Sequence, residues 1–411
     1  MTNQHFSVSV ILLGFVLSVQ VLYAAAFLPL VHSSRPSIMT KTSSSSKRRQ
    51  LILATSSKDS QAISSEDSSA ATIDQSTLTL LEHININVPS HEYILDFYWQ
   101  VLGCGMDPRK AENLRPDAPK KTLWANCGAS QFHLPYGDVG QAVRGQIGLR
   151  FADLGLVQQQ LDAHRSCYQS YEVIETAPDG KTPTCLLIVD KYGNQLYCRP
   201  NKPLISNKPR LAENWRQPFI SSTDTETWGD DVVSRFGKET TNCQGIDYAE
   251  FLVPPGTAET IALFYEKVLE ATTSVLEVPS TTNRAGNAAS PGTTKIAIVA
   301  LGNISPQGQA DQSLIFRETP RERIPAYDGH HIALYVGQSA EDFEYTFENC
   351  KTAGVVWVNP RFSDKVMDLE GARQEKQFRF KDIVDLKTGK VVYELEHEVR
   401  SVQHNAFPGE L

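Results

Sequence analysis

LEHININVPSHEYILDFYWQVLGC, at residues 81–104, is the stretch that decides the fold, because its pattern recurs later in the chain. Residues 246–271 read IDYAEFLVPPGTAETIALFYEKVLEA, which again places Val-Pro before a segment carrying Phe-Tyr-x-x-Val-Leu. In the first copy, Ile84, Ile86 and Val88 alternate with polar residues as in a half-buried strand, and apolar residues then recur at helical spacing. An internal repeat of this kind fixes the architecture. Each copy is therefore predicted to begin with a strand followed by a helix.

Short strand-like runs follow each predicted helix: KTLWANC and SQFHLP in the first copy, KIAIVAL and QSLIFRE in the second. The strand-then-helix pattern restarts at Arg144 and at Gly329, and in the latter segment Ser339 and Asp342 have the spacing of a capping box. Further strand-like runs close each copy. We therefore predict an α+β fold in which each copy is a pair of βαβββ modules.

This organisation resembles the vicinal oxygen chelate superfamily, which includes glyoxalases and extradiol dioxygenases, over roughly residues 81–400. The turn DKYGNQL at residues 190–196 resembles the family's closing turn before its last strand. The segments FRFKDIVD and YELEHEVRS near the C-terminus resemble a poorly characterised branch of the superfamily. The resemblance implies two tandem domains, each a pair of modules forming a curled-sheet cup.

The resemblance also implies where a metal would bind. In the family's metal enzymes, one residue from each of four strands can face a divalent ion. His, Gln and Glu suit this role because an imidazole nitrogen or a side-chain oxygen can bind the metal while other coordination positions remain open for substrate. Carried over by position, the first copy offers His83, His133 and Gln146 as metal ligands, with Tyr197 on its last strand. A glyoxalase-like site has Glu on two of these strands, and a dioxygenase-like site needs two His and one carboxylate. The first cup departs from both patterns.

The second copy offers fewer ligands. The same count gives Tyr248, Ile315, His331 and Tyr393. Glu394 follows Tyr393 and would join His331 as a ligand only if the strand shifts by one residue, because such a shift reverses the face that a side chain occupies. Glu250 is a further candidate, and tyrosines are expected to line the cups, namely Tyr197, Tyr248 and Tyr393.

Three charged residues near the C-terminus, Glu396, His397 and Glu398, are interpreted as a solvated strand edge, because charges on an edge strand prevent unwanted pairing.

Two classes of function fit these residues. The first is a protein that binds a small oxygen-bearing ligand and, with one divalent metal, acts as a lyase, isomerase or dioxygenase. The residues do not distinguish Fe, Mn, Zn, Ni and Mg, and a chain without a metal fits them equally well. The second class is a non-catalytic binding protein or a self-assembling structural protein, which the missing carboxylates and the cup tyrosines favour.

The first 58 residues form a separate segment. They contain no Asp or Glu but six Lys and Arg residues, and an apolar run at residues 8–27 ends in Ala24, Ala25 and Ala26, as at a signal cleavage site. The Ser-rich basic stretch that follows is typical of a transit peptide. With Phe27 directly after the alanines, the arrangement resembles the bipartite presequence of algae whose plastids lie inside the endomembrane system. We expect the mature protein in the plastid stroma.

Charge and cysteine content narrow the set of partners. The chain has a formal net charge of -8, and removal of the six basic residues leaves the remainder near -14. Such an acidic surface disfavours nucleic acid and anionic membranes, which attract basic groups, so a small-molecule ligand or a second copy of the chain is the expected partner.

The seven cysteines show no C-x-x-C pair, so buried free thiols are expected.

These observations divide the chain into seven parts. We predict a signal peptide at 1–26, a transit peptide at 27–58, a disordered spacer at 59–76, a first βαβββ-pair domain at 77–202, a connector at 203–243, a second βαβββ-pair domain at 244–400 and a C-terminal tail at 401–411.

Overall fold

The computed structural model describes residues 74–114, 121–201, 216–279 and 292–408. The predicted signal peptide and transit peptide lie outside these ranges. No helix within the described ranges is both long enough and apolar enough to cross a membrane.

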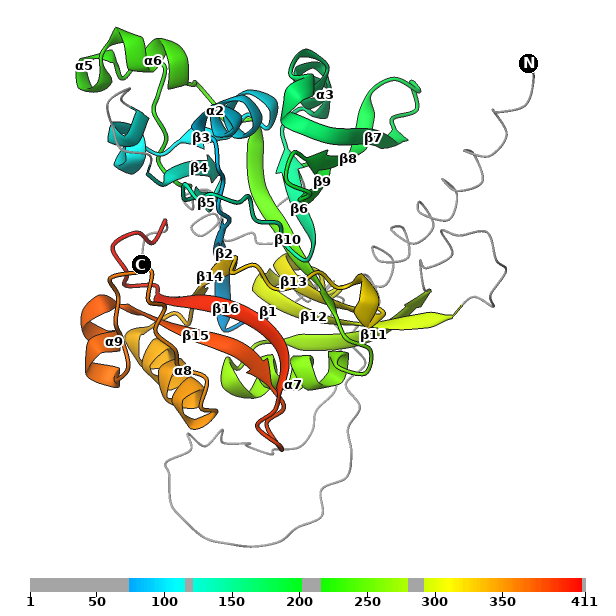
Figure 1. The fold of residues 1–411 in the computed structure, drawn as a ribbon, viewed down its shortest axis with the longest axis vertical. Helices are drawn as coiled ribbons and strands as arrows, with labels where there is room; N and C mark the ends of the chain where they lie inside the picture. Colours follow the sequence, from blue (N-terminus) through cyan, green and yellow to red (C-terminus); the bar gives the residue numbers. More distant parts are fainter. Residues whose placement is uncertain (1–73, 115–120, 202–215, 280–291, 409–411) are drawn as a thin grey trace, which may run out of the picture.

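Both copies have the expected α+β composition, and four modules follow one another along the chain (Figure 1). The first contains β2 (Leu78–Asn85), α2 (His91–Ile94), η1 (Leu95–Val101, a π-helix), β3 (Gly105–Met106), η2 (Pro108–Leu114), β4 (Leu123–Cys127) and β5 (Ser130–Leu134). The second contains β6 (Gly145–Phe151), α3 (Leu154–Ala163), η3 (Arg165–Cys167), β7 (Tyr168–Thr176), β8 (Pro183–Asp190) and β9 (Gln195–Pro200).

The second copy repeats this order, except that its last module has two strands after its helices where the other modules have three. Its first module contains β10 (Cys243–Val253), α7 (Ala258–Val268), β11 (Thr273–Pro279), β12 (Thr293–Ile304) and β13 (Ala310–Glu318). Its second contains η4 (Arg321–Arg323), β14 (His331–Val336), α8 (Ala340–Thr352), α9 (Leu369–Glu375), β15 (Gln377–Val384) and β16 (Val391–Ser401). The predicted capping box at Ser339 and Asp342 is confirmed at the start of α8.

The strands form two sheets that each combine one module from each copy. The seven-stranded sheet has the order β15-β16-β14-β2-β5-β4-β3 and therefore joins the first and fourth modules. The nine-stranded sheet has the order β1-β12-β13-β10-β6-β9-β8-β7, with β11 beside β12 and β1 spanning Asp74–Gln75, and joins the second and third. The joining pairs, β2 with β14 and β6 with β10, are both antiparallel. Each sheet thus depends on both copies.

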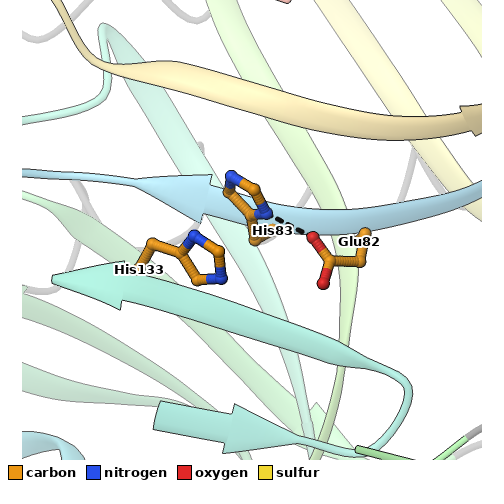
Figure 2. A group of neighbouring side chains, drawn as sticks. All are labelled: Glu82, His83 and His133. Carbon is orange, nitrogen blue, oxygen red and sulfur yellow. Dashed lines mark hydrogen bonds and ion pairs between the residues drawn. The ribbon is translucent and has the colours of Figure 1, made fainter. Parts of the chain in front are cut away.

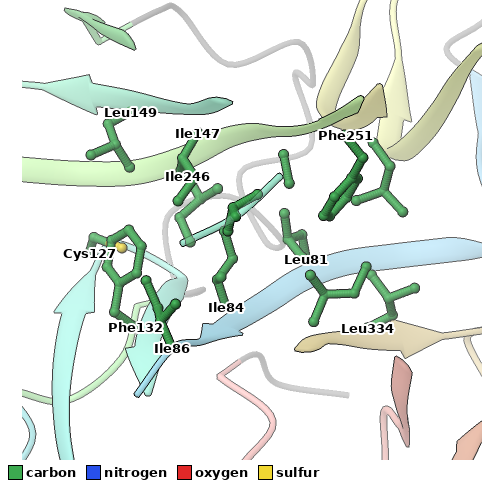
Figure 3. Close-up of a cluster of buried hydrophobic side chains, with 14 of the residues drawn as sticks. Leu81, Ile84, Ile86, Cys127, Phe132, Ile147, Leu149, Ile246, Phe251 and Leu334 are labelled. Carbon is green, nitrogen blue, oxygen red and sulfur yellow. The ribbon is translucent and has the colours of Figure 1, made fainter. Parts of the chain in front are cut away.

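One hydrophobic core runs between the sheets. Leu81 and Ile84 of β2 lie near Ile147 of β6, Phe251 of β10 and Leu334 of β14 (Figure 3). All five side chains are buried. They lie on the first strands of the four modules, so all four modules contribute to the same apolar cluster. Alternation along β2 then sends His83 to the opposite face of its sheet.

The connector docks on the first module. It contains α5 (Thr225–Trp228) and α6 (Asp230–Phe236). The buried Phe236 ring lies 6.4 Å from the Trp99 ring of η1, measured between centroids. All seven cysteines are buried and free, which confirms the expectation from their spacing.

Candidate metal centre

The polar face of the seven-stranded sheet gathers histidines and a carboxylate from four adjacent strands. His83 lies on β2, His133 on β5, His331 on β14 and Glu398 on β16, and all four side chains are buried. In the strand register, Ala333 of β14 is opposite His83 on one side and opposite Glu398 on the other. Because a methyl group is small, the two larger side chains can approach each other across it.

Glu82 determines which nitrogen of His83 faces this site. The register pairs Leu81 with Leu334 and His83 with Ala333, so Glu82 is the extra residue of a β-bulge. Its carboxylate accepts a hydrogen bond from Nδ1 of His83, as Figure 2 shows. With the proton on Nδ1, the lone pair of Nε2 points toward His331 and Glu398. This carboxylate–histidine arrangement is the one that orients metal-binding histidines.

Three ligand atoms converge at this point. Nε2 of His83 lies 3.4 Å from Nε2 of His331, and Oε2 of Glu398 lies 3.9 Å and 3.7 Å from these two nitrogens. Atoms bound to one divalent ion at roughly 2.1 Å lie about 3.0 to 3.4 Å apart. The observed separations are only slightly wider, so the three side chains fit one ion after small movements.

The charges on these groups suit metal binding. Burial lowers the pKa of His83 well below its ordinary value, which keeps the imidazole neutral. Burial alone would raise the pKa of Glu398, but Arg400 and Arg379 outweigh it and hold that pKa well below the ordinary value. Metal ligands must be deprotonated, and at neutral pH both of these groups are.

His133 lies beside this set rather than within it. Its ring stacks on His83 with 3.6 Å between centroids, and on its other side it stacks on Trp124 at 4.3 Å. Nε2 of His133 lies 3.1 Å from Oε1 of Gln131 and is already engaged. Figure 2 shows His133 next to the Glu82–His83 pair, and ligand atoms of these three residues lie within 4.8 Å of one another. His133 therefore supports His83 or serves as an alternative ligand.

No family profile matches the sequence, and no curated protein sequence matches it either. Solved structures do match. Glyoxalase I from Zea mays is 12% identical, with 79% of this chain and 92% of that chain covered and a TM-score of 0.43. A proposed dioxygenase from Bacillus subtilis is 14% identical, with 81% and 88% covered and a TM-score of 0.42. Catechol 2,3-dioxygenase is 12% identical, with 80% and 89% covered and a TM-score of 0.26.

Four modules in two curled sheets, each joined through antiparallel first strands, define the architecture. This is the α+β architecture that the repeat in the sequence predicts. At these identities and TM-scores the similarities do not indicate an activity, so activity has to be argued from the residues of the site.

Within this fold, the expected grouping of His83 and His133 with Gln146 and Tyr197 needs correction. Gln146 and Tyr197 lie in the nine-stranded sheet, on β6 and β9. There the Tyr248 hydroxyl donates to Oε1 of Gln146 at 2.6 Å, and Arg199 donates to the Tyr197 hydroxyl at 2.9 Å. The count along one copy failed because each module takes its sheet partner from the other copy.

The nine-stranded sheet does not repeat the metal-binding arrangement. The Tyr248 ring lies across Gly148, where an added Cβ would be only 2.2 Å from the ring. Glu250 forms an ion pair with Arg317 at 2.8 Å. None of the histidine and carboxylate groupings with metal-binding spacing that occur among the described residues lies in this sheet. This face is filled by its own side chains.

The second-copy candidates on β16 are also placed differently from the expectation. Glu394 is exposed and pairs with Lys381 at 3.6 Å, while Tyr393 packs against Phe251 and Phe316 in the core rather than lining a cup. His331 does lie in the site, as predicted. The carboxylate that lies beside His83 and His331 is four residues beyond Glu394, because β16 is longer than β9, which gives the predicted position.

Glu398 was missed because Glu396, His397 and Glu398 were interpreted as a solvated edge. That interpretation is wrong: β16 lies between β15 and β14, and all three residues are buried. A signal was present in the sequence, since Glu396, Glu398 and Arg400 alternate with Leu395, His397 and Val399. Strict alternation over six residues indicates a strand with one polar face.

Proposed function

We propose that the protein is a metal-dependent enzyme that binds one divalent ion on His83, His331 and Glu398 and acts on a small ligand with adjacent oxygen atoms. The observation that carries this proposal is the convergence of two imidazole nitrogens and one carboxylate oxygen from three neighbouring strands. Two His and one carboxylate on one face, with the other positions open, is the ligand set of non-haem Fe(II) oxygenases. Dioxygenase chemistry is therefore favoured over the lyase and isomerase alternatives.

The protein's own residues prepare the site for this chemistry. When bound, a divalent ion supplies a Lewis acid that polarises an oxygen of the ligand. Glu82 holds His83 in the required tautomer, and Arg400 donates to Oε1 of Glu398 at 2.6 Å, which fixes the carboxylate. The Tyr335 hydroxyl, on the same face, is buried beside Arg400, and its proton has no hydrogen-bond acceptor among the described residues. Burial raises its pKa, so it stays protonated and can donate to a ligand oxygen.

A second candidate function follows from the arginines around Glu398. Arg379 and Arg400 contact both carboxylate oxygens, and Arg379 also binds Asp364 at 2.7 Å and Glu396 at 2.9 Å. A buried network of this kind is internally compensated without a metal. This observation supports a non-catalytic protein that binds a ligand or assembles with itself.

Oxygen uptake tests the leading proposal. The chain is loaded with Fe²⁺ under anaerobic conditions and mixed with aerated solutions of catechols, whose adjacent oxygens can chelate the ion. We expect oxygen consumption by the parent and by the Glu394→Gln variant, and at least a hundredfold slower consumption by His331→Ala. A parent that binds Fe²⁺ but consumes no oxygen with any catechol would contradict dioxygenase chemistry and favour a lyase or isomerase.

A further inference from the structure

The connector between the two copies is fitted closely to the first module. The backbone N–H of Gln217 donates to the carbonyl of Gly128 at 2.8 Å, and that of Ile220 donates to the carbonyl of Met106 at 3.1 Å. A Cβ added to Gly105 would lie 2.6 Å from Cβ of Phe219. Gly105, on the edge of the first module, therefore leaves the space that Phe219 of the connector occupies, so the connector packs closely against this module.

Gln217 links the connector to the candidate metal centre through Glu82. Its side chain is 3% exposed, and Nε2 donates to Oε1 of Glu82 at 3.4 Å and to the carbonyl of Ala129 at 3.3 Å. Its Oε1 accepts a hydrogen bond from Arg109 at 2.9 Å. Glu82 is the residue that orients His83, so the connector contacts the partner of a metal ligand directly.

A second chain of hydrogen bonds leads from the same glutamine to the other side of His83. Arg109 donates to Asp107 at 2.8 Å, and Gln131 donates to the same carboxylate at 2.6 Å. Gln131 in turn accepts from His133, whose ring stacks on His83. Gln217 thus lies where the two routes to His83 meet.

We infer that Gln217 is a positioning residue for the metal centre, and this inference rests on the proposed metal binding. Arg400 approaches Oε2 of Glu82 at 3.2 Å, so the donor from Gln217 to Oε1 is what holds the other end of the carboxylate. A carboxylate held at both oxygens keeps Oε2 facing Nδ1 of His83. The connector, which belongs to neither copy, is then a functional part of the site.

The test is a Co²⁺ titration of the full chain, followed by the visible absorption of the bound ion. Gln217→Leu removes both the donor and the acceptor, and we expect its Co²⁺ affinity to fall by roughly 10- to 100-fold, the usual effect of losing a partner of a metal ligand. Gln244→Leu is the matched control, because Gln244 borders the same cavity as Gln217 but donates to the Thr241 carbonyl instead of Glu82. Its affinity should stay within about twofold of the parent, since it contacts no partner of a metal ligand.

A double-mutant cycle with Glu82→Gln separates positioning from general loss of structure. If Gln217 acts through Glu82, Gln217→Leu should cause little further loss of affinity in the Glu82→Gln background. If Gln217→Leu does not fold, Gln217→Asn provides the same test, because the shorter amide cannot reach Glu82. A parent-like affinity in the Gln217 variants, or losses that simply add, would overturn the inference while leaving the metal site intact. A parent that binds no Co²⁺ would overturn both.

Discussion

Nε2 of His83, in the first copy, lies 3.9 Å from Oε2 of Glu398, in the second copy. The two strands that carry them are separated in the sheet only by β14, which supplies His331. The candidate metal centre therefore exists only when the first and fourth modules pair. Among the described residues, the duplication yields one candidate site that is shared between the copies.

Separating the copies should therefore abolish metal binding. We expect neither residues 77–202 nor residues 244–400, produced alone, to bind Co²⁺ with the affinity of the full chain, because each lacks at least one ligand. Co-expression of residues 77–243, which retain the connector, with residues 244–400 should restore binding. The measurement is a Co²⁺ titration of each preparation, and full affinity in the first segment alone would favour the set His83, His133 and Gln146 instead.

Glu398 and Glu394 should differ sharply in their effect on stability. Glu398→Gln leaves the buried Arg379 and Arg400 without their shared charge and should lower the free energy of unfolding by about 3 to 5 kcal/mol. Glu394 is exposed, so Glu394→Gln should change it by less than about 0.5 kcal/mol. Urea denaturation of the metal-free proteins measures both. Equal effects would contradict the placement of β16.

Substitutions in the nine-stranded sheet test whether the metal site is confined to the seven-stranded sheet. A Cβ at Gly148 would collide with the Tyr248 ring, so Gly148→Ala should destabilise the fold by about 1 to 3 kcal/mol. Because this face holds none of the proposed ligands, the Co²⁺ affinity of the folded variant should equal that of the parent. Tyr248→Phe, which removes only the hydroxyl that donates to Gln146, serves as the control. A large loss of affinity in either variant would indicate a metal site in this sheet.

Stability should fall in mildly acidic solution. Burial lowers the pKa of His404 to about 4, from an ordinary value of 6.5. As the pH falls below 6.5, the unfolded chain takes up a proton at this position that the folded chain does not, so folding becomes less favourable until about pH 4. Unfolding measured across this range should show the decline in the parent and a smaller decline in His404→Asn. Identical slopes would show that His404 does not contribute.

The presequence can be tested independently of the fold. A fluorescent protein fused after residue 58 should enter the plastid of an alga whose plastids lie inside the endomembrane system. Replacing Phe27 by Ala should stop the fusion at the plastid envelope, since the position directly after the signal cleavage site is the one that the resemblance singles out. Secretion of the unaltered fusion would refute the proposed stromal location.

Much of the fold was predictable from local patterns, whereas the pairing of modules was not. The repeat of Val-Pro and Phe-Tyr-x-x-Val-Leu specifies each strand and helix, and the buried Phe97 and Phe264 confirm it. Alternation within β2 or β6 shows that each needs a neighbouring strand but does not say which one. Either pairing of the four modules satisfies the same periodicity, so the sheet partners had to come from the structure.

Only part of the site was predictable, again because local periodicity does not reveal which strands are neighbours. His83, His133 and His331 lie on first or last strands and were found by position, and the structure brings them together. Glu398 was missed because its segment was interpreted as a solvated strand edge and because the strand length of the first copy was used to count along the second. Glu82 could not be anticipated, because its role depends on a β-bulge that the sequence pattern does not reveal.

The central claim is a single metal ion shared by the two copies, and the most direct test is the metal content of the purified chain. Elemental analysis after incubation with Fe²⁺, Mn²⁺, Co²⁺, Ni²⁺ or Zn²⁺ and removal of excess should give one ion per chain for the parent and for Glu394→Gln. The His83→Ala, His331→Ala double variant should retain almost none while remaining folded by circular dichroism. A parent without stoichiometric metal, or a double variant that retains one full equivalent, would contradict the account.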